Sequence, residues 1–113
     1  ECRINAEDPN KNFCPSPGRI ERLRIPGGFG VRFDTDIYEG YQISPYYDSL
    51  IGKLIVWDRD RNSAIAKMIG ALNELIIEGV ETTIPFHLKI LNNAFYQKDE
   101  FYTNFLQRRI LKE

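Results

Sequence analysis

The sequence predicts an α+β fold, in which an antiparallel β-sheet is followed by C-terminal helices that pack on it. Before residue 58, apolar and polar residues alternate in several short stretches, which is the period of a strand with one buried face. From about residue 62 the apolar residues recur every three or four positions, the period of an amphipathic helix. With 113 residues, 42% of them hydrophobic, the chain suits one domain with a core and is too small for two ordinary ones. Residues 1–113 are therefore expected to form a single domain.

The first expected strand covers residues 1–7, where ECRINAE alternates strictly between the two faces. Its buried face would carry Cys2, Ile4 and Ala6. Residues 8–18 contain three prolines and a glycine and are expected to form a loop, because these residues break regular structure. Alternation resumes less cleanly over residues 18–26, which favours a second strand.

A further strand is expected directly after the GGFG stretch at residues 27–30. Val31 and Phe33 would face the packed side of this strand and Arg32 the opposite side. A turn is expected at Gly40. Farther along, residues 54–57 are apolar at every position, which favours a central strand that is covered on both faces.

The longest expected helix begins near Asn62, with Asn62 or Asp60 as its N-cap, and ends at a left-handed cap on Gly79. A short strand is expected at the start of VETTI (80–84). It would lead into a helix that is capped at Thr82 or Thr83, carries Pro85 in its first turn, and ends before Asn92 or Asn93. A last helix is expected over about residues 99–111.

Composition argues against several classes of partner. Lys and Arg number 15 against 16 Asp and Glu, a net charge of -1, so a nucleic-acid partner is not expected. No apolar run approaches the roughly 20 residues of a membrane helix, and the polar start does not resemble a signal peptide. Two cysteines are too few for a disulfide framework, so reduced thiols and a cytoplasmic location are expected. The start at Glu1 favours a piece of a longer chain.

The GGFG stretch does not fit a nucleotide-binding loop. A dinucleotide fingerprint needs glycine at position 33, which is Phe33, and a phosphate-binding P-loop before Lys53 needs glycine at position 47, which is Tyr47. The more economical interpretation is a turn whose positive φ angles require glycine.

Arg32 is the main candidate for chemistry. Its permanently charged, planar guanidinium suits a carboxylate, a bicarbonate or a developing oxyanion. The alternative is an ordinary strand arginine that is paired with Asp34, Asp36 or Asp48.

The other reactive residue types are expected to be ordinary. His87, the only histidine, lies within a predicted helix and has no nucleophile nearby in sequence. Ser49 lacks a nucleophile-elbow motif. Four aspartates in D-x-D pairs do not match metal-ligand spacing and are expected to be turn residues; they are Asp34, Asp36, Asp58 and Asp60. No metal site and no nucleotide site are expected in these residues.

Long stretches of the chain, taken in order, resemble the C-terminal part of biotin carboxylase. They are ECRINAEDP, PSPG, GGFGVRFD, YYDSLIGKLIVWDRDR, AIAKM and LNELIIEGVETTI. The ending LQRRILKE resembles the close of the stand-alone bacterial subunit, whereas multi-domain relatives such as pyruvate or propionyl-CoA carboxylase continue.

This resemblance implies a function for the longer enzyme. Biotin carboxylase uses ATP and Mg²⁺ to activate bicarbonate and carboxylates biotin that is held on a carrier protein. By resemblance, Arg32 binds biotin and bicarbonate and stabilises the biotin enolate, while Gly27, Gly28 and Gly30 support its loop. The ATP-grasp domains that bind nucleotide and metal would lie upstream, so the fragment alone is expected to be inactive and to hold no cofactor.

The resemblance also implies partners. The full enzyme would be a homodimer and would meet a biotin carboxyl carrier protein and its own upstream domains. Residues 57–61 would lie either in the dimer contact or against the upstream domains. The ending favours the acetyl-CoA carboxylase of fatty-acid synthesis. The alternative is a non-catalytic scaffold or dimerisation module of another biotin-dependent carboxylase.

Overall fold

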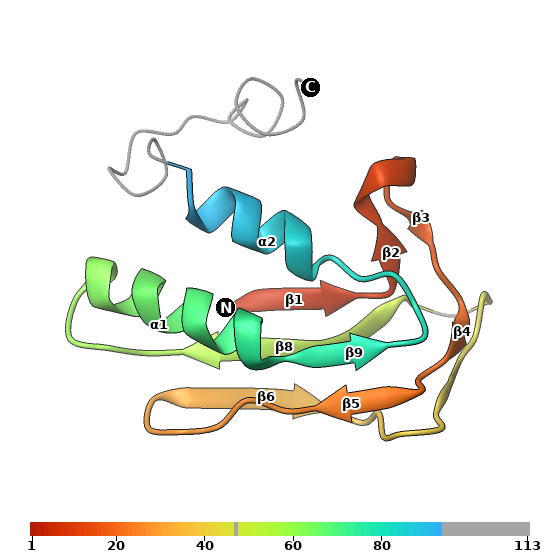
Figure 1. Cartoon of the computed structure of the whole chain (residues 1–113), viewed down its shortest axis with the longest axis horizontal. Helices are drawn as coiled ribbons and strands as arrows, with labels where there is room; N and C mark the ends of the chain where they lie inside the picture. The colour runs from red at the N-terminus through yellow and green to blue at the C-terminus, as the bar shows by residue number, and fades with distance from the viewer. Residues whose placement is uncertain (47, 94–113) are drawn as a thin grey trace.

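The computed structural model describes residues 1–46 and 48–93, and its centre is a three-stranded antiparallel sheet (Figure 1). The sheet has the order β1 (Cys2–Asn5), β8 (Leu50–Val56), β6 (Val31–Thr35). The long apolar strand is therefore central, as its sequence predicts. Three two-stranded pairs surround it: β2 (Glu7–Asp8) with β3 (Cys14–Pro15), β4 (Gly18–Arg19) with β7 (Gln42–Ile43), and β5 (Arg22–Arg24) with β9 (Ile76–Glu78).

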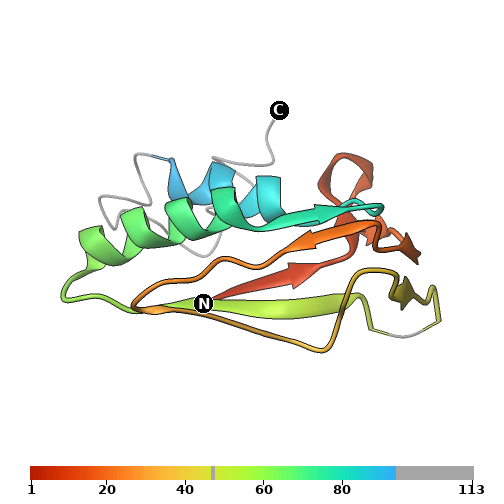
Figure 2. The ribbon, with the colours of Figure 1, turned by 60° about the horizontal axis from the view of Figure 1, so that its bottom comes forward.

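Two helices, α1 (Arg61–Glu74) and α2 (Ile84–Leu91), lie on one side of the sheet (Figure 2). The core forms between α1 and the sheet, because Leu72 of the helix and Ile4 and Leu54 of the strands lose nearly all contact with solvent. The alternation of the first strand is confirmed, since Cys2, Ile4 and Ala6 are all buried. The predicted α+β fold, an antiparallel sheet with helices packed on it, is confirmed.

The opposite side of the sheet, called here the open face, carries polar side chains. Cross-strand partners share a face, and Cys2, Leu54 and Phe33 are successive partners on the helix side. The alternate positions therefore point away from the helices. They are Arg3 on β1, Lys53 and Ile55 on β8, and Arg32 and Asp34 on β6.

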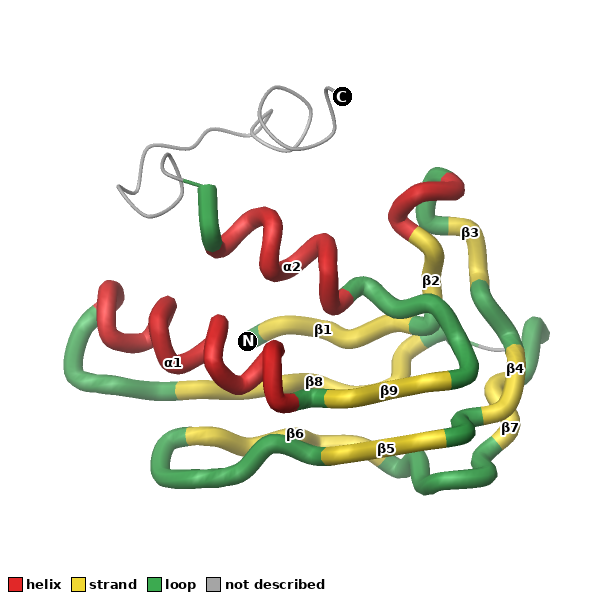
Figure 3. Tube along the Cα trace, in the orientation of Figure 1, coloured by secondary structure: helices red, strands yellow, loops and turns green. Residues whose placement is uncertain are grey.

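The end of the first long helix differs from the sequence-based prediction. Helix α1 begins after Asp60, whose carboxylate accepts a hydrogen bond from the Ser63 backbone at 2.7 Å, so that cap is confirmed. The helix stops at Glu74 rather than near Gly79, because residues 76–78 form β9 and pair with β5 (Figure 3). Gly79 has a left-handed φ of 114°, but it follows a strand rather than capping the helix.

Two further predictions need correction. Residues 8–18 are not a plain loop, because they contain parts of β2, β3 and β4 and the 3-10 turn Pro9–Lys11. The strand before α2 is β9, not a segment that starts at residue 80. Helix α2 itself is confirmed, with Thr83 and Asn92 at its ends, although the Thr83 side chain does not cap it. The helix predicted over 99–111 lies outside the described residues.

Neither helix among the described residues combines the length and the apolar character that a membrane crossing requires.

Candidate functional site

The GGFG stretch is a tight turn that is fixed by its neighbours. Gly28 and Gly30 have φ angles of 116° and 75°, so the predicted need for glycine is confirmed at these two positions. Gly27 has no such angle. The Gly30 carbonyl accepts a hydrogen bond from the Trp57 backbone at 3.0 Å. Lys67 of α1 then donates to the Trp57 carbonyl at 3.1 Å, so strand, turn and helix meet at one point.

Arg32 follows this turn and lies on the open face, as its place in the strand predicts. Its Nε is 3.0 Å from Oδ1 of Asp34, so one of the three pairings that the sequence offered as the alternative to a functional role is present. The Arg32 side chain is nevertheless 60% exposed. An exposed ion pair of this kind contributes at most about 1 kcal/mol to stability. The guanidinium therefore stays accessible to a ligand, with part of its charge balanced by Asp34.

Arg3 is a second arginine on the same face, and the sequence analysis did not single it out. It is exposed and is the direct cross-strand partner of Lys53, which in turn is the partner of Asp34. Its guanidinium makes no recorded ion pair with any residue that the structure describes. The only sequence signal for it is its place in a strand between two buried residues.

The backbone beneath Arg3 is held by the loop before α2 and by α2 itself. The Arg3 carbonyl accepts hydrogen bonds from the Thr83 hydroxyl at 3.2 Å and from Nε2 of His87 at 2.8 Å. Because a carbonyl can only accept, Nε2 of His87 must carry a proton. Burial lowers the pKa of His87, and this hydrogen bond opposes the shift. His87 is thus a structural residue, consistent with its interpretation from sequence.

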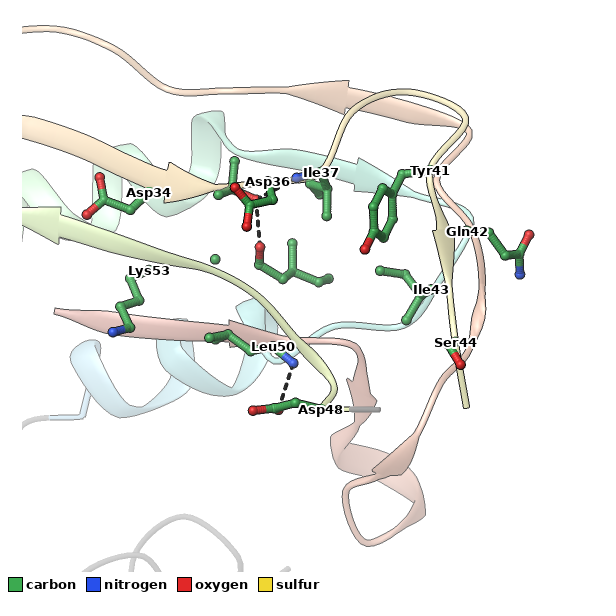
Figure 4. Close-up of a pocket in the computed structure, with 13 residues that line it drawn as sticks. Asp34, Asp36, Ile37, Tyr41, Gln42, Ile43, Ser44, Asp48, Leu50 and Lys53 are labelled. Carbon is green, nitrogen blue, oxygen red and sulfur yellow. Dashed lines mark hydrogen bonds between the residues drawn. The ribbon is translucent and has the colours of Figure 1, made fainter. Parts of the chain in front are cut away.

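A pocket of about 400 Å³ adjoins the open face at the far end of β6 and β8 (Figure 4). Its lining combines the apolar residues Ile37 and Ile51 with three carboxylates: Asp34, Asp36 and Asp48. Asp48 is already engaged, because its Oδ1 accepts from the Leu50 backbone at 3.0 Å. Arg32 does not line this pocket.

The remaining candidates have local structural partners. Ser49 donates its hydroxyl proton to Glu7 at 2.9 Å, so it is not poised as a nucleophile. Asp58 accepts from the Arg59 backbone and lies 3.3 Å from Lys67, and these contacts, the backbone one first, lower the pKa of its carboxyl. Within residues 1–46 and 48–93 no group of three or more His, Cys, Asp or Glu side chains could hold a metal ion.

The two cysteines are free, as predicted. Cys2 is buried in the core, and burial raises the pKa of its thiol, whereas Cys14 is exposed on β3.

Comparison with known proteins places these features in a family. Residues 1–108 match the family described as the biotin carboxylase C-terminal domain. The chain is 57% identical over 107 residues to Biotin carboxylase 1 of Bacillus subtilis, a match that covers 95% of this chain and 24% of that protein. It is 50% identical to a pyruvate carboxylase subunit from Methanothermobacter thermautotrophicus, across 100% of this chain and 25% of that protein.

A solved structure agrees with these matches. It is the biotin carboxylase domain dimer of the 2-oxoglutarate carboxylase of Hydrogenobacter thermophilus, in complex with MgADP, ADP and bicarbonate. It is similar to this chain with a TM-score of 0.91 at 49% identity, and the match covers 94% of this chain and 23% of that one. The chain therefore spans about a quarter of the length of the relatives it matches.

Proposed function

The chain belongs to the biotin carboxylase C-terminal domain family, and from this premise we propose that it serves an enzyme that carboxylates biotin with bicarbonate and ATP. The observation that carries the proposal is the family match across residues 1–108. A similar solved structure holds MgADP and bicarbonate, which supports the same substrates for the longer protein. Nucleotide and Mg²⁺ would be bound by the remaining three quarters of such an enzyme rather than by these residues.

The chemistry explains why such a domain would present arginine. Removing the proton from the biotin ureido nitrogen leaves negative charge on the ureido oxygen. A fixed guanidinium beside that oxygen stabilises the charged state more than it stabilises neutral biotin, and only such differential stabilisation speeds the reaction. The open face, where arginines project from two strands of one rigid sheet, is suited to this task.

Two arginines compete for the role. The sequence-based assignment is Arg32, in the loop-and-strand segment that begins with Gly27, Gly28 and Gly30. Its contact with Asp34 at 3.0 Å counts against it, because a neighbouring carboxylate offsets the charge that the oxyanion needs. Arg3 is the second candidate. It lies on the same face, has no recorded carboxylate partner among the described residues, and has its backbone fixed by Thr83 and His87.

The proposal extends to the complete carboxylase in which this domain would work. We propose acetyl-CoA carboxylase and a separate biotin carboxyl carrier protein as this setting, because the chain is similar to a protein named Biotin carboxylase 1. The relatives also include a 2-oxoglutarate carboxylase and part of a pyruvate carboxylase, so pyruvate and 2-oxoglutarate are the alternative acceptors. A homodimer is supported by the dimer named for the similar structure. Trp57 is 57% exposed and is available for such a contact.

The test uses the full-length enzyme and measures ADP formation that depends on both biotin and bicarbonate. Arg3→Ala and Arg32→Ala are compared with Arg24→Ala, which removes an exposed arginine from β5. Replacing the arginine that stabilises the oxyanion should lower the rate about 10²- to 10³-fold, whereas Arg24→Ala should change the rate little. If both open-face variants keep wild-type activity, the scaffold alternative replaces the catalytic one. An inactive wild type would overturn the proposed function altogether.

A further inference from the structure

Thr83 lies at the start of α2, but its hydroxyl does not serve that helix. It occupies the N-cap position, where a threonine ordinarily accepts a hydrogen bond from a backbone N–H of the first turn. Here the side chain makes no such bond. Its hydroxyl is bonded instead to β1, 78 to 80 positions earlier in the chain. A hydroxyl diverted from its local partner in this way calls for a reason outside the helix.

The hydroxyl of Thr83 bridges two residues of β1, Arg3 and Asn5. It accepts a hydrogen bond from the Asn5 N–H at 3.0 Å and donates one to the Arg3 carbonyl at 3.2 Å. The Thr83 N–H donates in turn to the Asn5 carbonyl at 3.1 Å. In the described sheet β1 has a strand neighbour, β8, on one edge only. Thr83 therefore takes the place of a strand along the other edge.

These three hydrogen bonds span an irregular point in β1. The pairing of β1 with β8 shifts register between Ile4 and Asn5, and such a bulge bends the strand and changes the direction of the side chains beside it. Arg3 and Asn5 lie on either side of the shift, so the bonds that tie both residues to one threonine fix the bend. Because Thr83 is only 4% exposed, water has little access to replace these bonds when the hydroxyl is removed.

We propose that Thr83 is a positioning residue for the carboxylation: its hydroxyl fixes the bend of β1, and with it the direction in which Arg3 projects from the open face. This rests on the proposed function, and within it on Arg3 as the arginine that stabilises the oxyanion. Thr83 acts through the backbone of β1 and takes no part in a covalent step. A guanidinium that is displaced by roughly 1 Å loses much of its alignment with the reacting oxygen.

Two variants at position 83 and one at position 82 separate positioning from stability. Thr83→Val keeps the shape of the side chain but removes the hydroxyl, whereas Thr83→Ser keeps the hydroxyl. Thr82→Val is the matched control, because Thr82 is also buried, at 7% exposure, and its recorded hydrogen bond is local, from the Ile84 backbone at 3.3 Å. Loss of that local bond should lower the thermal midpoint without disturbing β1.

The experiment measures biotin-dependent carboxylation by the full-length enzyme, with kcat and the KM for ATP determined separately, together with the thermal midpoint of each variant. Thr83→Val should lower kcat about 10- to 100-fold, as is typical when a residue that orients a reacting group from behind is lost. The KM for ATP should stay unchanged, because the nucleotide would bind in the rest of the enzyme. Thr83→Ser should retain most of the activity, and Thr82→Val should retain the wild-type kcat.

A double-mutant cycle tests whether Thr83 acts through Arg3. Once Arg3 has been replaced by alanine, Thr83→Val should lower kcat no further, because the group that Thr83 positions is then absent. If Thr83→Val does not fold, Thr83→Cys takes its place in every comparison, since a thiol is a weaker donor and acceptor than a hydroxyl. The loss of kcat should then be smaller but should follow the same pattern.

Three results would overturn the inference. The first is a wild-type kcat in Thr83→Val. The second is a loss of kcat that Thr82→Val reproduces or that Thr83→Ser does not rescue, since either would show a purely structural role. The third is an equal fold-loss with and without Arg3. A wild-type enzyme without biotin-dependent activity would instead overturn the proposed function, so the two failures are distinct.

Discussion

Replacing Gly30 by alanine should distort the point where β6, β8 and α1 meet. Gly30 has a φ of 75°, and a Cβ at this position would lie 2.7 Å from the Trp57 carbonyl oxygen and 2.5 Å from Nζ of Lys67. The Lys67 side chain can move away, but this movement breaks its hydrogen bond to the Trp57 carbonyl and its contact with Asp58. The Trp57 carbonyl cannot move away, because the backbone of Trp57 is held by the hydrogen bond from its N–H to the Gly30 carbonyl.

The magnitude follows from comparing the three glycines of the turn. Gly27 has open space around it and no left-handed angle, so Gly27→Ala should change the free energy of unfolding by less than about 0.5 kcal/mol. Gly28 has the angle, 116°, but open space, so Gly28→Ala should cost about 1–3 kcal/mol. Gly30 has both the angle and the collisions, which add about 1–3 kcal/mol of overpacking.

Denaturant unfolding, followed by the fluorescence of the single tryptophan, Trp57, measures this series. Gly70→Ala is a control of opposite sign. Gly70 lies inside α1, and an added methyl group would meet nothing within 4 Å, so alanine there should stabilise by roughly 0.5–1 kcal/mol. Equal costs for Gly27→Ala and Gly30→Ala would refute the reasoning from turn geometry.

Two further predictions concern protonation and thiol reactivity. Because the pKa of His87 is lowered in the folded protein, the unfolded chain binds a proton at His87 first as the pH falls. The contribution of His87 to the free energy of unfolding is therefore complete above pH 6.5, the ordinary pKa of histidine, and is lost as the pH falls below 6.5. His87→Gln, which can still donate to the Arg3 carbonyl, should flatten this pH dependence in unfolding experiments, and an unaltered dependence would exclude His87 as its source. A maleimide should label Cys14 rapidly and Cys2 only on unfolding, as mass spectrometry would show, because Cys2 is buried with a raised thiol pKa. Equal labelling rates would contradict the burial of β1.

The strands of the sheet could be predicted because apolar and polar residues alternate along each of them, and this alternation is visible within a few residues of sequence. β1, β6 and β8 lie where that period places them, and Arg32 faces away from the helices as expected. The end of α1 could not be predicted in this way, because Leu75 and Ile76 continue the helical period. Ile76 instead pairs with Arg24 of β5, about 50 residues earlier in the sequence, and local periodicity does not reveal such a partner.

In the candidate site, too, relations between residues close in sequence could be predicted, and relations across strands could not. The sequence identified Arg32 and offered Asp34 among its possible partners, since two positions apart on a strand is a local relation. It did not single out Arg3 with Lys53, because their proximity depends on the register between β1 and β8. A single sequence does not fix pairing between strands that lie about 50 residues apart. The family resemblance is confirmed, whereas the roles of individual residues stay predictions.

The contacts of Arg3 with Thr83 and His87 join segments that lie 80 and 84 positions apart in the chain. On a ribosome that adds about 5–20 residues per second, the first strand must wait roughly 4–17 s before these partners exist. During that interval the apolar side of β1, which includes Ile4, stays uncovered until β8 and then α1 have been synthesised. Nascent copies are consequently exposed to mispairing and to chaperones, and slow translation of the region up to residue 87 would lengthen that vulnerable period.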